Sequence, residues 1–202
     1  MIGIIDYGMG NLSSVQKALE SLKASTIITA DKEELEKCHG LILPGVGAFP
    51  DAMKNIKNNE LDQFIKDYSF SGKPFLGICL GMQLLFDIGY EVEPTEGLGL
   101  IRGKIKKLEI DYKIPHMGWN SLDIKRECKL IQGVENGSYV YFVHSYYAEV
   151  ENEANLAATA DYGIDVPAVV QNGNVFGAQF HPEKSGDVGM LMLKNFIDMI
   201  SK

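Results

Sequence analysis

The sequence predicts an α/β fold in which an open, mostly parallel β-sheet is flanked by helices and continued by an added antiparallel strand region. Two observations carry this prediction. In the first half of the chain, short β-branched runs alternate with helical patterns, which is typical of βαβ units. Beyond Gly89, glycines become frequent and the apolar runs are typical of antiparallel strands. The chain of 202 residues is most economically one domain, residues 1–202, because this length buries a substantial core.

The first half is expected to supply the parallel strands and the helices that cover them. The expected strands are residues 2–6, 26–29, 40–43 and 74–78, and the expected helices are residues 12–23, residues 51–68 and a segment after Cys79 that carries Met82, Leu84, Leu85 and Phe86. In sheets of this kind ligands bind in the crevice at the carboxyl ends of the strands. We therefore look for chemistry where these strands end.

The second half is expected to add antiparallel strands and a closing helix. The expected strands are residues 100–110, 139–150, 156–160, 167–171 and 174–180, and the closing helix is residues 188–200. Residues 171–174 read Gln-Asn-Gly-Asn, which is a hairpin signal. This hairpin would join two of the antiparallel strands.

Residues 75–83 read Phe-Leu-Gly-Ile-Cys-Leu-Gly-Met-Gln, which places Cys79 where a buried strand ends and a helix begins. Glycines on both sides leave room for a tight turn and for a substrate, as in the nucleophile elbow built on serine. The alternative is that Cys79 only fills the core, since free cysteine is among the most buried residue types. Gly77 and Gly81 favour the elbow, because glycine at a buried strand end is costly without a structural need.

A partner base is found near the other end of the chain, in Val-Phe-Gly-Ala-Gln-Phe-His-Pro-Glu-Lys at residues 175–184. Positions two apart in an extended segment lie on the same side, so Glu183 can reach the imidazole of His181 and fix its tautomer. The alternative is a histidine at a strand end, with Pro182 stopping the strand and Glu183 solvated. Together with the elbow, the predicted set is a nucleophile, a base and an orienting carboxylate.

A thiolate that attacks an amide needs hydrogen-bond donors aimed at the oxygen that becomes negative. One expected donor is the backbone N–H of Leu80, the residue after the nucleophile. A second can come from the glycine-rich turn at residues 43–49, which ends another parallel strand. Its alternative is an ordinary turn between a strand and a helix.

No cofactor and no metal are expected. Residues 6–12 follow the first strand and open a helix, but a dinucleotide-binding pattern would need its third glycine at Ser13, and no Walker lysine follows. The three cysteines, Cys38, Cys79 and Cys128, show no metal-ligand spacing. His116 and His144 are candidates for a site, although histidine among aromatic residues is more often structural.

Charge and hydropathy exclude two classes of function. A net charge of −8 argues against nucleic-acid binding, for which a basic face is expected. No apolar run is long enough to span a bilayer, and the first residues lack the basic start of a signal peptide. We therefore expect a cytoplasmic protein without a membrane partner.

With these motifs in place, the whole chain resembles the class I glutamine amidotransferase family and, more narrowly, its members that work in histidine biosynthesis. The motifs that carry the resemblance are residues 6–11 (Asp-Tyr-Gly-Met-Gly-Asn), 44–47 (Pro-Gly-Val-Gly), 77–83 (Gly-Ile-Cys-Leu-Gly-Met-Gln), 115–120 (Pro-His-Met-Gly-Trp-Asn), 141–146 (Tyr-Phe-Val-His-Ser-Tyr) and 179–184 (Gln-Phe-His-Pro-Glu-Lys). The resemblance implies a flavodoxin-like sheet and the hydrolysis of glutamine to glutamate and ammonia through a cysteinyl thioester.

The resemblance also implies roles for individual residues. The implied catalytic triad is Cys79, His181 and Glu183. The implied oxyanion region is Gly45, Val46 and Leu80, and the implied glutamine pocket is Gly47, Gln83, His144, Ser145 and Tyr146.

The implied partner is a (βα)8-barrel cyclase subunit that forms a heterodimer with this chain and receives the ammonia. The interface candidates are Met117, Trp119, Asn120 and Lys184. The resemblance further implies that the isolated chain hydrolyses glutamine slowly, because residues 44–47 must reorient when the loaded partner is bound.

Two other interpretations of the residues remain open. A cysteine peptidase or γ-glutamyl hydrolase would use the same cysteine and histidine, although Gln83 and Glu183 favour the amidotransferase. A redox-sensing module would only oxidise the elbow cysteine, and it would not need His181.

Overall fold

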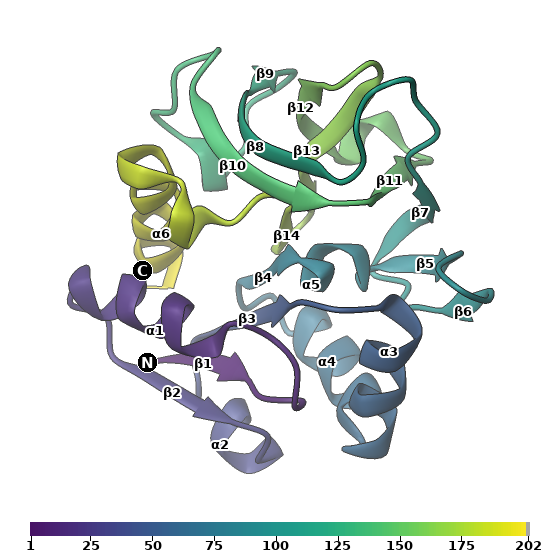
Figure 1. Cartoon of the computed structure of the whole chain (residues 1–202). Coiled ribbons are helices and arrows are strands. Elements are labelled where there is room, and N and C mark those ends of the chain that lie inside the picture. The colour runs from purple at the N-terminus through teal and green to yellow at the C-terminus, as the bar shows by residue number, and fades with distance from the viewer. Residues whose placement is uncertain (201–202) are drawn as a thin grey trace.

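The computed structural model describes residues 1–200 and is built around an eight-stranded sheet (Figure 1). The strands from β2 to β14 run parallel, and the remaining three alternate in direction. In spatial order the strands are β2 (Thr26–Thr29), β1 (Ile2–Ile5), β3 (Gly40–Gly45), β4 (Phe75–Cys79), β14 (Val175–Ala178), β13 (Asp165–Asn172), β12 (Leu156–Asp161) and β9 (Asp123–Ile124). The predicted fold class, a mostly parallel sheet with an added antiparallel region, is confirmed.

Helices cover both faces of the parallel strands (Figure 1). On one face lie α1 (Leu12–Ser21) and α6 (Gly186–Ile200), and on the other lie α2 (Lys32–Glu36), α3 (Phe49–Asn58) and α4 (Leu61–Phe70). Alternation along β3 explains this arrangement, because Leu41 and Leu43 pack with α3 and α4 while Ile42 packs with α1 and α6. Buried on both sides, these strands carry the crevice at their carboxyl ends.

Two smaller sheets complete the molecule. A four-stranded sheet contains, in spatial order, β11 (Tyr146–Val150), β7 (Ile101–Lys107), β5 (Phe86–Gly89) and β6 (Thr95–Glu96). A two-stranded ribbon pairs β8 (His116–Ser121) with β10 (Tyr139–His144) in antiparallel register. Short 3-10 helices are η1 (Lys129–Ile131), η2 (Glu153–Asn155) and η3 (Pro182–Lys184).

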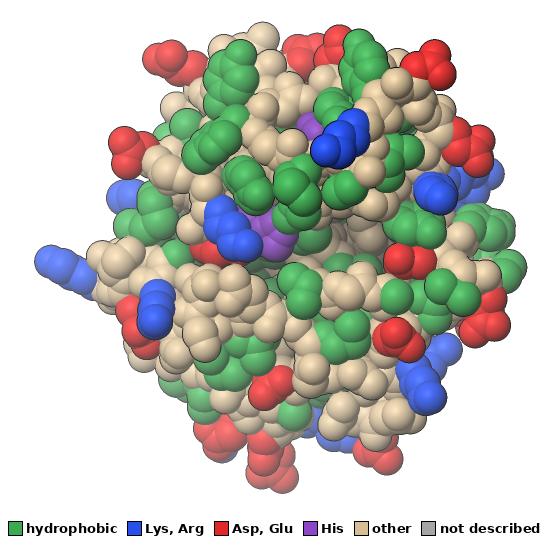
Figure 2. Space-filling model, viewed as in Figure 1, with side chains coloured by type: hydrophobic (Ala, Val, Ile, Leu, Met, Phe, Trp, Pro, Cys, Tyr) green, Lys and Arg blue, Asp and Glu red, His purple; other side chains and the backbone are tan. Residues whose placement is uncertain are grey.

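The β8–β10 ribbon has two chemically different faces. Side chains alternate along each strand, so that Met117, Trp119 and Tyr139 are exposed on the outer face while His116 and His144 are buried on the inner face. Figure 2 shows hydrophobic side chains gathered over this ribbon, beside a hollow in which a histidine is visible. The ribbon thus forms one wall above the carboxyl ends of the parallel strands.

Several predicted elements in the first half were wrong in extent. The helical region expected over residues 51–68 consists of two helices, α3 and α4, because Glu60 adopts the left-handed conformation with φ 54° and interrupts the helical hydrogen bonds. The helix expected after Cys79 is the single turn α5 (Leu80–Gln83). Phe86, expected in that helix, begins strand β5.

In the second half, the structure differs from the predicted elements in two further places. The strand expected over residues 139–150 is divided at Ser145 into β10 and β11, which belong to different sheets. No strand was expected over residues 115–120, but residues 116–120 form most of β8. The predicted hairpin is confirmed, since β13 and β14 pair with Asn172 opposite Val175. Among residues 1–200, no helix is both long and apolar enough to cross a membrane.

Candidate active site

Cys79 ends β4 and immediately precedes α5, with φ 56° and ψ −112°. A positive φ is rare for a residue with a side chain, and such strain gathers at functional sites. The neighbouring glycines are required by close packing. A Cβ on Gly81 would lie 1.8 Å from the carbonyl oxygen of Leu43, and one on Gly77 would lie 2.5 Å from the carbonyl oxygen of Gly81. The predicted elbow geometry is confirmed.

The end of β3 lies directly beside the elbow. Gly45 is opposite Cys79 in the parallel register, and the exposed residues Val46 and Gly47 follow. The carbonyl oxygen of Pro44 accepts a hydrogen bond of 3.0 Å from the hydroxyl of buried Tyr7. Burial, together with the nearby Cys79, raises the pKa of Tyr7 well above its usual range, so the hydroxyl keeps its proton and remains a donor.

His181 and Glu183 form a buried pair behind the elbow. The Nδ1 atom of His181 lies 2.8 Å from Oε1 of Glu183, and their side chains are 5% and 1% exposed. Burial disfavours the imidazolium, but hydrogen bonds to Cys79 and Glu183 outweigh it and raise the pKa of His181 to about 9. At neutral pH the ring therefore carries protons on both nitrogens, with one of them directed to Glu183.

The backbone around His181 is fixed to the β8–β10 ribbon. The amide of His181 donates to the carbonyl of Tyr141 at 3.0 Å. The hydroxyl of buried Ser185 donates to the carbonyl of His181 at 2.7 Å and accepts from the amide of Tyr141 at 3.0 Å. Ser185 thus joins strand β10 to the histidine, a role that the sequence did not reveal.

A cavity of about 290 Å³ opens above Cys79. It is lined by Val46, Gly47, Cys79, Leu80, Gln83, Glu91, Val143, His144, Ser145, Tyr146 and His181. The structure therefore brings together the predicted nucleophile, the predicted base and every residue predicted for the glutamine pocket. Of the predicted oxyanion residues, Val46 and Leu80 line the cavity, and Gly45 pairs with Cys79 at its edge.

Two residues that line the cavity, Val143 and the charged Glu91, were not among the predicted site residues. The Oε2 atom of Glu91 accepts a hydrogen bond of 2.8 Å from the amide of Phe49 at the start of α3, and the residue lines the cavity together with Val46 and Tyr146. In the sequence it is one of several acidic residues in a turn-like stretch. No local pattern distinguished it, because its place in the cavity depends on tertiary packing.

The predicted interface residues lie around the ribbon, with one difference in orientation. Met117 and Trp119 are 60% and 56% exposed on its outer face, and Lys184 is exposed on η3 next to His181. The side-chain amide of Asn120 instead points inward, where Nδ2 lies 2.8 Å from the carbonyl of Asp161 and 3.2 Å from Nε2 of His116.

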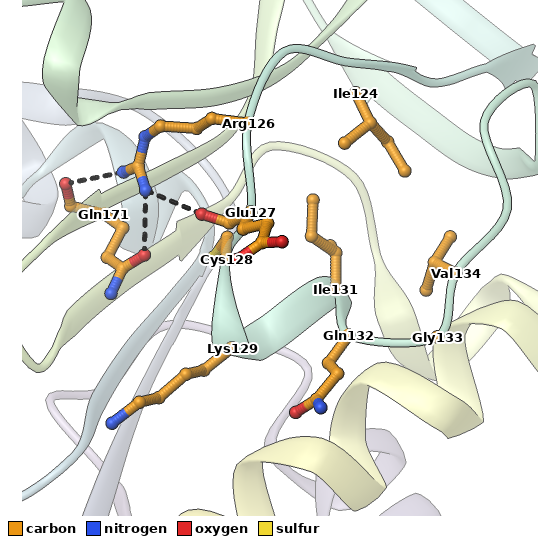
Figure 3. A pocket seen from close by; sticks show the side chains of 10 residues that line it. All are labelled: Ile124, Arg126, Glu127, Cys128, Lys129, Ile131, Gln132, Gly133, Val134 and Gln171. Atoms are coloured by element: carbon orange, nitrogen blue, oxygen red, sulfur yellow. Dashed lines mark hydrogen bonds between the residues drawn. The ribbon is translucent and has the colours of Figure 1, made fainter.

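A larger hollow of about 630 Å³ lies elsewhere, along the loop between β9 and η1 (Figure 3). Its guanidinium group, on Arg126, is already hydrogen-bonded to Gln171 and to the carbonyl of Glu127. Burial raises the pKa of the Cys128 thiol, which keeps it protonated, and no histidine lines this hollow. The hollow offers no pair of nucleophile and base. Within residues 1–200, no group of three histidine, cysteine or acidic side chains is arranged to hold a metal ion.

Comparison with known proteins extends over the whole chain. The model of the family described as glutamine amidotransferase class-I matches residues 3–199. The chain is 56% identical over 196 residues to the imidazole glycerol phosphate synthase subunit HisH of Bacillus anthracis (strain CDC 684 / NRRL 3495), covering 97% of this chain and 93% of the relative. The same protein of Bacillus cereus (strain G9842) is also 56% identical, with the same coverage.

Among solved structures, one described as a crystal structure of glutamine amidotransferase is similar with a TM-score of 0.79 at 19% identity, covering 100% of this chain and 99% of that chain. The structure of PurLQS from Thermotoga maritima gives a TM-score of 0.73 at 20% identity, covering 98% and 97%. These structures are similar to this chain in fold.

Proposed function

The chain belongs to the class I glutamine amidotransferases, and on that premise we propose that it is the glutaminase subunit of an imidazole glycerol phosphate synthase. In this role it hydrolyses glutamine to glutamate and ammonia, and a cyclase subunit uses the ammonia to form imidazole glycerol phosphate and aminoimidazole carboxamide ribonucleotide in histidine biosynthesis. The observation that carries the proposal is that Cys79 and His181 line one cavity and that His181 is hydrogen-bonded to Glu183.

In the first half of the reaction the Cys79 thiolate attacks the side-chain carbonyl carbon of glutamine. Because His181 is protonated at neutral pH, it gives its Nε2 proton to the amide nitrogen as the C–N bond breaks and ammonia leaves. Backbone N–H groups at Leu80 and at residues 45–46 would stabilise the negative oxygen. Glu183 holds the ring and offsets its positive charge throughout.

In the second half water attacks the thioester carbon. His181 accepts a proton from this water, the C–S bond breaks to restore the thiolate, and the new carboxyl group loses its remaining proton to solvent. Glutamate then leaves.

The cavity fits a free amino acid, which carries an ammonium and a carboxylate group on its α-carbon and, in glutamine, a neutral amide at the other end. Glu91 presents a carboxylate that can pair with the α-ammonium group of glutamine, while Ser145 and Tyr146 line the wall beside it. Gln83 also lines the cavity and holds this wall in place, because its Nε2 donates to the carbonyl of Tyr146 at 2.9 Å and to Oε1 of Gln179 at 3.0 Å. We infer that Glu91 selects for a free amino acid over a glutamine inside a peptide.

The partner is proposed to be a (βα)8-barrel cyclase that binds the outer face of the β8–β10 ribbon in the cytoplasm. Exposed aromatic and methionine side chains such as Trp119 and Met117 are typical anchors of protein interfaces, and the same ribbon forms a wall of the active site. Lys184, exposed at the end of the 3-10 helix that follows His181, adds a positive charge to this surface.

The proposal is tested by measuring glutamate release from glutamine by wild type and Cys79→Ala, each alone and mixed with a cyclase subunit that carries its acceptor ribonucleotide. We expect release that depends on Cys79 and rises strongly in the loaded mixture. Equal rates with and without the partner would contradict a partner-gated glutaminase. Cleavage of peptides or folate polyglutamates in place of glutamine would assign the site to a peptidase or γ-glutamyl hydrolase.

A further inference from the structure

The inner face of the β8–β10 ribbon buries two histidines that take no proton in the proposed reaction. His116 and His144 are 2% and 6% exposed, and Nδ1 of His116 lies 3.0 Å from Nε2 of His144. Burial lowers the pKa of His116 to about 4. Burial is also the main cause that lowers the pKa of His144 to about 3. Both rings are therefore neutral, and each has one donor and one acceptor nitrogen.

The hydrogen bond of His144 near the cavity determines which ring nitrogens carry the protons. Nδ1 of His144 is 2.8 Å from the carbonyl oxygen of Tyr146, and a carbonyl oxygen only accepts. The proton of His144 is therefore on Nδ1, and its Nε2 is an acceptor. The proton between the two rings must then come from Nδ1 of His116.

The other end of the pair requires the same arrangement independently. Oδ1 of Asn120 accepts from the amide of Ser121 at 2.8 Å, and Nδ2 donates to the carbonyl of Asp161 at 2.8 Å, so the orientation of this amide is fixed. Its second N–H then donates to Nε2 of His116 at 3.2 Å. That bond requires an unprotonated Nε2 and a protonated Nδ1 on His116, in agreement with the cavity end.

The hydrogen bonds therefore run in one direction, from Asn120 through His116 and His144 to Tyr146. At the far end the carbonyl of Tyr146 accepts a second bond from Gln83, so both of its lone pairs are used. The peptide that contains this carbonyl joins Tyr146 to Tyr147, directly after the cavity-lining residues Ser145 and Tyr146. Its orientation is thus fixed by two bonds, one of which depends on His116.

The ring of His116 is held in place by stacking. It lies between the rings of Phe142 and Tyr162, with centroids at 4.5 Å and 3.9 Å and interplanar angles of 16°. Stacking fixes the plane of the ring, while the hydrogen bonds fix its rotation within that plane. A change that keeps the stacking and removes the nitrogens would isolate the second effect.

We propose that His116 is a positioning residue for glutamine binding, because its ring relays a one-way chain of hydrogen bonds from Asn120 on the docking ribbon to the Tyr146 peptide in the cavity wall. This inference rests on the proposed function. It assigns His116 an effect on glutamine affinity rather than on the chemical step.

The test compares His116→Phe with His116→Asn in the complex with the loaded cyclase. Phenylalanine keeps the stacked ring but leaves Nε2 of His144 without a donor, so the KM for glutamine should rise roughly tenfold with kcat changed less than about threefold. Asparagine keeps a donor near Nδ1 and should restore KM to within about threefold of wild type. Tyr162→Phe, which loses a hydrogen bond to the carbonyl of Lys113 but keeps its stacking, is the matched control and should match wild type.

A second measurement does not depend on activity. Nitrogen-15 NMR of the histidine rings in the unmutated chain should show both His116 and His144 with the proton on Nδ1. A proton on Nε2 of either ring would overturn the chain of bonds. Wild-type KM in His116→Phe, or equal losses in both His116 variants and in Tyr162→Phe, would overturn the positioning role, whereas an inactive wild-type complex would contradict the proposed function instead.

Discussion

The carboxylate of Glu183 is buried against the ring of His181, which in the proposed mechanism gains and loses a proton during turnover. We expect Glu183→Gln to lower the pKa of His181 from about 9 toward its ordinary value of 6.5 and to reduce kcat by roughly 10²- to 10⁴-fold. Titration of the ring by NMR and measurement of glutamate release would check both effects. A kcat within about threefold of wild type would contradict the role of Glu183.

The same pair makes stability depend on pH. Because the pKa of His181 is raised in the folded state, its contribution to the free energy of unfolding is fully present below pH 6.5 and is lost as the pH rises through about 9. The difference in the free energy of unfolding between wild type and Glu183→Gln should therefore shrink between pH 6.5 and 9.5. It should shrink by about 1.4 kcal/mol for each unit by which the pKa of His181 differs between the two proteins. Urea denaturation of both proteins at pH 6.5 and 9.5 measures this difference in stability. A difference that grows as the pH rises would contradict the prediction.

Tyr7 is a second residue whose effect extends beyond its own hydrogen bond. Removing the hydroxyl in Tyr7→Phe should cost about 1–2 kcal/mol in the free energy of unfolding. It should also lower kcat by about tenfold. The reason is that Tyr7 holds the carbonyl of Pro44, and the next residue, Gly45, lies opposite Cys79 at the end of β3.

The matched control for Tyr7 is Tyr68→Phe. Tyr68 is buried and donates at 3.0 Å to the carbonyl of Cys38, at a place that does not line the cavity. It should lose similar stability without a change in kcat. Equal kinetics in the two variants would show that the Tyr7 bond only stabilises the fold.

At the scale of secondary structure, the elbow depends on one-turn helix α5 lying directly against β3. Gly81→Ala should remove activity and destabilise the chain by more than about 3 kcal/mol, because the added Cβ would meet the backbone oxygen of Leu43. Thermal unfolding and glutamate release would measure the effects. Gly137→Ala is the comparison, since its φ is +83° but nothing lies within 4 Å, and it should cost only about 1 kcal/mol.

The elements around the elbow were predictable because their signals are local. Apolar runs bounded by glycine gave β3 and β4, and the Asn-Gly turn gave the hairpin of β13 and β14. The break between α3 and α4 was not predictable, because Glu60 takes a left-handed conformation that usually favours glycine. Strand β8 was also missed, because Gly118 and Asn120 are residue types depleted in strands.

The residues of the candidate site likewise differ in whether a local sequence pattern identifies them. Cys79, His181 and Glu183 follow from patterns within a few residues, and the structure brings them together. Glu91 and Tyr7 could not be identified, because they reach the site only through the packing of separate segments. The direction of each bond in the His116 chain likewise requires three-dimensional neighbours.

At the scale of the whole molecule, the outer face of the ribbon should govern association with the cyclase. Trp119→Ala should weaken the complex by at least about tenfold, because a large exposed aromatic side chain is a typical interface anchor. Isothermal titration calorimetry with the cyclase subunit measures this. Phe70→Ala removes a side chain that is 83% exposed on α4 and should leave the affinity unchanged; equal affinities in all three proteins would place the interface elsewhere.

The alternation of the β8–β10 ribbon has a consequence for how its length can vary. Its odd-numbered positions Met117, Trp119 and Tyr139 face outward, and its even-numbered positions His116 and His144 face inward. A one-residue insertion within either strand would exchange the two sets beyond that point, placing aromatic side chains in the cavity wall and imidazoles at the surface. Insertions and deletions in this ribbon are therefore tolerated only in the loops that connect its strands.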